Sequence, residues 1–196
     1  MGFRDDSEVP SQTVYNSSVH SNIDCKVTKG AKFMNEITKR SMKTKYLIQA
    51  SIIAAVYVAI TIAFAPISYG YIQVRISEAL TILPFFTPAA IPGLFVGCFI
   101  ANFLGPLSVA DLIIGSSASL IASVLSYKLR HRQILVPLPP VTVNGVMIGA
   151  MLYFIYGVPV PLWMCMAFVT VGQIIACYGI GYPLLCFLKK YRRIFE

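Results

Sequence analysis

The sequence predicts an all-α integral membrane protein, a bundle of six transmembrane helices with both termini in the cytoplasm. Of its 196 residues, 57% are hydrophobic and only 12% are charged, which is about half the charged fraction of an average soluble domain. The mean hydropathy is +0.71. The charges also lie in clusters, and none falls between Gln133 and Phe187. These observations exclude an ordinary soluble enzyme and predict a multi-pass protein of the cell membrane.

The basic residues fit membrane topology better than nucleic-acid binding. Lysine and arginine number 16, and the formal net charge is +8. Basic side chains that bind nucleic acid gather along a groove with interleaved aromatic residues, whereas these lie at the ends of apolar runs. We therefore expect membrane lipid as a partner and no nucleic acid.

The first 41 residues differ in composition from the rest of the chain. They are polar, carry charges of both signs and lack the layout of a signal peptide. We expect residues 1–41 to be a disordered cytoplasmic tail. Met34 and Met42 are alternative translation starts, so the working protein can lack this tail. Residues 42–196 are expected to form the six-helix transmembrane domain.

Five apolar stretches supply the expected membrane spans. Residues 46–66 are long enough for one crossing, which needs about 20 helical residues. Residues 71–104 are too long for one crossing, and Pro84, Pro88 and Pro92 interrupt them. They predict two short helices that meet between residues 87 and 91. The remaining crossings are residues 106–127, 134–156 and 160–187.

The basic clusters determine whether the number of crossings between them is odd or even. Cytoplasmic segments of membrane proteins carry the excess of lysine and arginine, which places all three clusters on one side. Four crossings before the middle cluster and two after it satisfy this rule. A re-entrant loop within residues 71–104 also satisfies it and leaves four crossings. The clusters are Lys39, Arg40, Lys43 and Lys45; Lys128, Arg130 and Arg132; and Lys189, Lys190, Arg192 and Arg193.

Three charged residues fall within the apolar stretches. A charge in the hydrocarbon costs at least about 3 kcal/mol, so Arg75, Glu78 and Asp111 need a partner or a function. Arg75 and Glu78 are three residues apart and share one face of a helix. The alternatives are an ion pair at the outer interface, an arginine that reaches the lipid headgroups, and, for Asp111, a place in the first turn of a helix.

Asn102, Asn144 and Gln173 also lie in apolar surroundings. A buried amide without a hydrogen-bond partner costs several kcal/mol, so each bonds either another helix or a ligand. A carboxylate can accept two parallel hydrogen bonds from the amidine edge of a guanine-like ring, and amides can pair with its carbonyl and ring nitrogens. The set therefore suits a planar polar heterocycle. The candidate substrate-binding residues are Arg75, Glu78, Asn102, Asp111, Asn144 and Gln173.

Small residues form a stripe on the first span and let another helix approach closely. The approaching helix can belong to a partner or to the same bundle. The stripe consists of Ala50, Ala54, Ala55, Ala59 and Ala63.

No motif in the sequence indicates catalysis. There is no glycine-rich loop for ATP, no nucleophile pattern and no cysteine or histidine spacing typical of a metal site. We expect no enzyme activity and no cofactor. A small bundle with a polar interior indicates a binding subunit.

Several motifs resemble the queuosine-precursor transporter (QueT) family. The most specific block is residues 75–97, which contains RISEALT, LPFF and PAAIPGL. The resemblance begins near Met42 and reaches the C-terminus. Further matches are NFL at residues 102–104, DLIIG at 111–115, YKLR at 127–130, LPP at 138–140, VN at 143–144 and YGIGYPLL at 178–185.

The resemblance implies a six-helix substrate-binding (S) subunit of an energy-coupling factor (ECF) transporter. Such subunits capture a vitamin-like compound outside the cell and dock on a transmembrane coupling subunit and two cytosolic ATPases. The implied substrate is a 7-deazaguanine precursor of queuosine. The implied docking surface is the small-residue stripe, here Ala50, Ala54, Ala55 and Ala59.

The resemblance also guides the roles in the site. We expect Glu78 on the donor edge of the base, with Arg75 orienting it. The family often has a glutamate where this chain has Gln173, so either Glu78 or Asp111 supplies the carboxylate here or the ligand differs. Competing readings are an S subunit for another heterocyclic vitamin, a proton-coupled secondary carrier that uses Glu78 or Asp111, and a structural subunit without a ligand.

Overall fold

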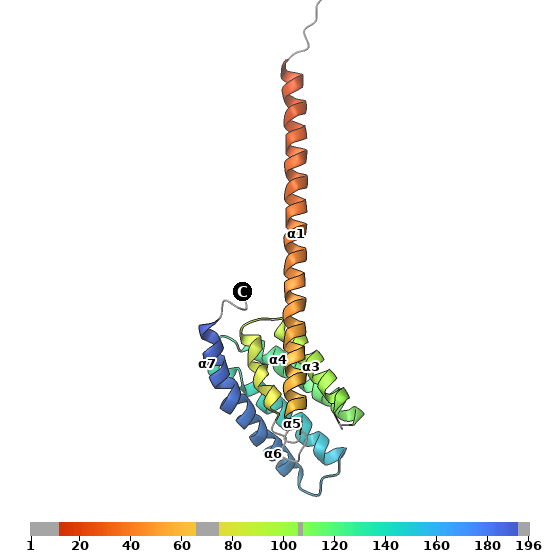
Figure 1. Cartoon of the computed structure of the whole chain (residues 1–196), viewed down its shortest axis with the longest axis vertical. Helices are drawn as coiled ribbons and strands as arrows, with labels where there is room; N and C mark the ends of the chain where they lie inside the picture. The colour runs from red at the N-terminus through yellow and green to blue at the C-terminus, as the bar shows by residue number, and fades with distance from the viewer. Residues whose placement is uncertain (1–11, 66–74, 106–107, 192–196) are drawn as a thin grey trace, which may run out of the picture. The chain divides into compact units, whose positions relative to one another are not determined.

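The computed structural model describes residues 12–65, 75–105 and 108–191, and the secondary structure of these residues is entirely helical (Figure 1). The chain divides into two compact units, Met1–Lys45 and Tyr46–Glu196. The first helix, α1, is Gln12–Ala63. The disorder that we expect for residues 1–41 stays a prediction, and so does the domain boundary at residue 42.

The second unit is a set of packed helices that begins with the last part of α1. Consecutive helices pack on each other from α3 to α6, and η1 packs on η4 and α4. The elements are the 3-10 helix η1 (Ile76–Phe85), α3 (Ala90–Leu104), the π-helical η2 (Asp111–Gly115), α4 (Ser116–Lys128), the 3-10 turn η3 (Gln133–Leu135), α5 (Leu138–Phe154), α6 (Leu162–Ile174), the π-helical η4 (Ile175–Gly181) and α7 (Tyr182–Lys190).

Two short helices, η1 and α3, fill the proline-rich stretch, as predicted, and they are separated by residues 86–89. Pro88 cannot donate a backbone hydrogen bond and disfavours helix geometry at the residue before it. At 10 and 15 residues, η1 and α3 are each about 20 Å long, which is less than the hydrocarbon thickness of about 30 Å.

Within the described residues, three helical segments are long and apolar enough to cross a membrane: Thr38–Ala63, Gln133–Phe154 and Leu162–Lys190. This confirms the all-helical class within the described residues and supports a membrane location. The count of six crossings and the side on which each terminus lies stay predictions. The end of the first expected span and the start of the second fall at residues 66–74, outside the described residues.

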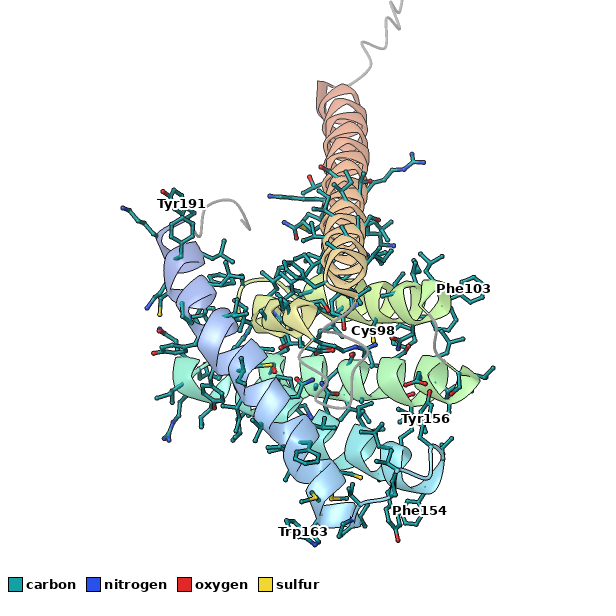
Figure 2. The ribbon with its side chains drawn as sticks, turned by 60° about the horizontal axis from the view of Figure 1, so that its bottom comes forward. Cys98, Phe103, Phe154, Tyr156, Trp163 and Tyr191 are labelled. Carbon is teal, nitrogen blue, oxygen red and sulfur yellow. The ribbon has the colours of Figure 1, made fainter. Side chains whose placement is uncertain are left out.

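The third long segment runs through α6, η4 and α7 without a break. Figure 2 shows Trp163 and Tyr191 at its opposite ends. Pro183 lies in the first turn of α7 and lacks the N–H group that a continuous α-helix would need there. The π-helical η4 precedes it and keeps the backbone helical.

Glycines let α3 approach α1 closely. A Cβ atom added at Gly93 would lie 2.7 Å from the Ala50 carbonyl oxygen, and one added at Gly97 would lie 3.1 Å from the Ala54 Cα atom. Ala54 is buried in this contact, while Ala55 and Ala59 are exposed. Packing within the chain's own bundle therefore accounts for Ala50 and Ala54, and docking of a partner on this stripe stays a prediction.

We expect Gly97→Ala to lower the free energy of unfolding by about 1–3 kcal/mol, as overpacking does. The added Cβ atom would lie 2.9 Å from the Cβ atom of the fully buried Tyr57, so α1 and α3 have to separate. Denaturant unfolding in detergent measures the change. Gly179→Ala is the control, because its Cβ atom would meet no atom within 4 Å. Equal stability of the two variants would contradict the close α1–α3 contact.

Candidate substrate-binding site

The buried carboxylate of Glu78 is the centre of the candidate site. Glu78 lies in the first turn of η1 and is 1% exposed. Its Oε1 atom accepts a hydrogen bond of 2.7 Å from the Tyr57 hydroxyl on α1. Its Oε2 atom has no hydrogen-bond partner among the described residues. A buried acceptor without a partner is costly and rare in native structures, so this oxygen is the candidate acceptor for a donor on a ligand.

Arg75 and Asn102 form the second part of the site. Arg75 directly precedes η1 and is buried, and its guanidinium donates a hydrogen bond to the Asn102 side-chain oxygen on α3. The Asn102 amide nitrogen donates to the Asp111 carbonyl oxygen at 3.0 Å. Gly115 makes room for this amide, because a Cβ atom there would lie 2.8 Å from it. The structure therefore brings together Arg75, Asn102 and the backbone of Asp111.

The Asp111 carboxylate is used by the protein itself. Its Oδ2 atom accepts hydrogen bonds from the Ser108 backbone nitrogen at 3.2 Å and from the Ser108 hydroxyl at 3.1 Å. The Tyr156 hydroxyl, in the loop after α5, also donates to it. Burial raises the pKa of the Tyr156 hydroxyl, and the hydrogen bond to Asp111 raises it further. Asp111 thus holds the start of η2 against this loop, which matches the alternative of a first-turn role.

Gln173 is connected to Glu78 through a thiol. The Cys177 Sγ atom, on η4, lies 3.5 Å from the Gln173 side-chain oxygen and 3.6 Å from the Glu78 carbonyl oxygen. It also lies 3.8 Å from the Thr81 hydroxyl. Asn144 is buried on α5, and no hydrogen bond within the described part of the chain joins it to the other five candidates. Hydrogen bonds of the Cys177 thiol therefore connect Gln173 to η1, and no hydrogen bond among the described residues does so for Asn144.

Tyr57 and Cys177 were not predicted from the sequence. Tyr57 lies in an apolar span and is fully buried, although its hydroxyl needs a partner there. The requirement of a buried tyrosine hydroxyl for a hydrogen-bond partner was the one feature of the sequence that could have identified Tyr57. Cys177 looked like any small core residue in the sequence.

The chemistry of the cluster suits the binding of a polar ligand. It offers a carboxylate oxygen, amides and hydroxyls, which recognise N–H and carbonyl groups. Over residues 12–65, 75–105 and 108–191 no three His, Cys, Asp or Glu side chains are grouped as metal ligands. A separate cavity of about 250 Å³ contains none of the candidate residues. It is lined by Leu152, Val158, Pro159, Val160, Cys165 and Phe168.

Comparisons with known proteins give one family. The family described as QueT transporter matches residues 47–190. The Queuosine precursor transporter QueT of Lactococcus lactis subsp. cremoris (strain MG1363) is 37% identical over 84 residues, which are 42% of this chain and 49% of that protein. The chain thus spans about half the length of the curated relative it matches. No solved structure matches this chain.

Proposed function

This chain belongs to the QueT transporter family, and we propose that it is the substrate-binding (S) subunit of an ATP-driven ECF importer for a queuosine precursor of the 7-deazaguanine type. The name of the Lactococcus relative supports the substrate class. The observation that carries the proposal is Glu78, a buried carboxylate whose Oε2 atom has no hydrogen-bond partner among the described residues.

A 7-deazaguanine has the groups that this carboxylate can recognise. Its ring N–H and its exocyclic amino group point in the same direction, and each carboxylate oxygen can accept two hydrogen bonds. Glu78 can therefore hold the Tyr57 hydroxyl on Oε1 and still accept from both donors of the base. Arg75, anchored on Asn102, holds the start of η1 and so orients Glu78. Asn144 and Gln173 are further candidates for contact with the ligand, while Asp111 supports the loops.

The proposal includes the topology and the partners. The chain would cross the membrane six times with both termini in the cytoplasm, and residues 1–41 would be an accessory tail. A transmembrane coupling subunit and two ATPase subunits would supply the energy, in keeping with a sequence that contains no glycine-rich loop for ATP. We place the docking surface on the exposed side of α1, at Ala55 and Ala59.

We expect 7-deazaguanines to raise the unfolding temperature of the purified chain in detergent. A ligand at 100 times its dissociation constant adds about 2.7 kcal/mol to the stability of the folded state. Guanine and common vitamins complete the panel. A shift only with another vitamin would keep the S-subunit role and discard the substrate, and no shift with any compound would contradict a binding role.

A proton-coupled carrier is the second candidate, because the buried Glu78 is a group that could carry a proton across the membrane. Uptake into cells distinguishes the two. The S subunit requires the coupling subunit and the ATPases. Uptake that persists without them and stops when the proton gradient is collapsed would favour the carrier. A purely structural subunit would lose assembly, and no ligand binding, when Glu78 is replaced.

A further inference from the structure

Like Glu78 Oε2, a second buried polar atom in the bundle lacks a hydrogen-bond partner among the described residues. The Ser119 hydroxyl, on α4, has no hydrogen-bond partner among the residues that the structure describes, and Ser119 is 1% exposed. Glu78 Oε2 is the acceptor of this pair, and the Ser119 hydroxyl can donate. Two complementary atoms without partners suggest one ligand between them, provided that they lie at the same level of the bundle.

The other buried serines of α4 make the Ser119 hydroxyl an exception. Serines in membrane helices usually donate to a carbonyl oxygen of the preceding turn. Ser116 and Ser123 do so, at 2.6 Å to Leu112 and 2.9 Å to Leu120. Ser126 donates across to the Val136 carbonyl oxygen at 2.8 Å. Ser119 lies on the same helix and is equally buried, but its hydroxyl makes no such hydrogen bond.

Contacts with α3 define the direction of η1. Arg75 at the start of η1 bonds Asn102. Glu78, one turn later, bonds Tyr57, which packs against Gly97. Gly97 lies more than one turn before Asn102 on α3. Therefore η1 and α3 run in opposite directions.

The same contacts put Ser119 and Glu78 at about the same level of the bundle, on two helices that pack on each other. The start of α4 lies opposite the end of α3, because Gly115 contacts the Asn102 amide, and the Arg75 guanidinium lies 3.8 Å from the Cβ position of Gly115. Hence α4 runs in the same direction as η1, on which it packs. Ser119 is four residues beyond Gly115 on the same helix face, and Glu78 is three residues beyond Arg75. Both steps advance about 6 Å along their axes.

We propose that Ser119 contacts the ligand and donates its hydroxyl to a ring carbonyl oxygen, while Glu78 Oε2 accepts from the ring N–H next to that carbonyl. The ligand class is a planar heterocycle with a cyclic amide edge. This inference rests on the proposed function and adds a specificity-determining residue to its site. The cost of a buried hydroxyl without a partner is then compensated when the ligand binds, as in other sites where function opposes stability.

The binding test compares Ser119→Ala with Ser126→Ala in the full chain, using isothermal titration in detergent. The probes are 7-deazaguanine and its 6-thio analogue, which keeps the ring N–H but replaces the carbonyl oxygen by a weakly accepting sulfur. Loss of one hydrogen bond predicts about tenfold weaker binding of 7-deazaguanine by Ser119→Ala and a much smaller change for the thio analogue. Ser126→Ala leaves both affinities unchanged. Equal losses for the two probes, or no loss, would overturn the inference.

The unfolding temperatures of the same two variants without ligand test the role of Ser119 independently of the proposed substrate. We expect the unfolding temperature of Ser119→Ala to equal or exceed that of the wild type, because a hydroxyl without a partner is removed. Ser126→Ala lowers it, because the Val136 carbonyl oxygen loses its donor. A lower unfolding temperature for Ser119→Ala would assign the hydroxyl to the fold and overturn the inference. If the wild type binds neither probe, the substrate proposal fails, and this measurement alone decides the role of Ser119.

Discussion

We expect Glu78→Gln to weaken the binding of 7-deazaguanine by about tenfold to a hundredfold, because hydrogen bonds to a charged group contribute about 1.5–3 kcal/mol. The amide keeps the size of the carboxylate, so the buried position is still filled. It loses the negative charge and turns an N–H group toward the donors of the ligand. Isothermal titration of the purified variant in detergent measures the change.

Asp111→Asn is the matched control for this substitution. It makes the same chemical change at the other buried acid, whose Oδ2 atom already accepts from Ser108 and Tyr156. We expect it to leave the affinity within a few fold of the wild type and to lower stability instead. An affinity loss at Asp111 and none at Glu78 would reverse the roles that we assign to the two carboxylates.

The sequence predicted the fold where local chemistry decides it. The prolines of residues 84–92 predicted the break between η1 and α3. Charge in an apolar span singled out Arg75 and Glu78, and both are buried in the structure. These features depend on neighbours in the chain.

The remaining features depend on which helices meet, and a single sequence does not contain that information. Tyr57 became part of the site because α1 passes η1 at Glu78. The alanine stripe was consistent with a partner or with the chain's own bundle, and only the position of α3 assigns Ala54 to the bundle. The Ser123 hydroxyl donates to a carbonyl oxygen of its own helix and the Ser119 hydroxyl has no partner among the described residues, a difference that cannot be predicted from the sequence.

We expect Asn102→Ala to be the most destabilising single change in the site, with a loss of about 2–4 kcal/mol in the free energy of unfolding. Hydrogen bonds between membrane helices contribute only about 0.6 kcal/mol on average. The Asn102 side chain, however, serves the charged Arg75 guanidinium and the Asp111 carbonyl oxygen at once. Its removal takes an acceptor from a buried charge, for which the penalty is larger than for a neutral group. Unfolding in detergent with increasing denaturant measures the loss.

Asn102→Asp separates the two hydrogen bonds. Aspartate keeps an acceptor for Arg75 and adds the opposite charge, while it loses the donor to the Asp111 carbonyl oxygen. If the bond to Arg75 dominates, Asn102→Asp retains more than half of the stability that Asn102→Ala loses. It also retains ligand affinity, because Arg75 still holds the start of η1 and with it Glu78. Equal instability of the two variants would instead assign the effect to the bond between α3 and η2, and Arg75 would lose its role in orienting the carboxylate.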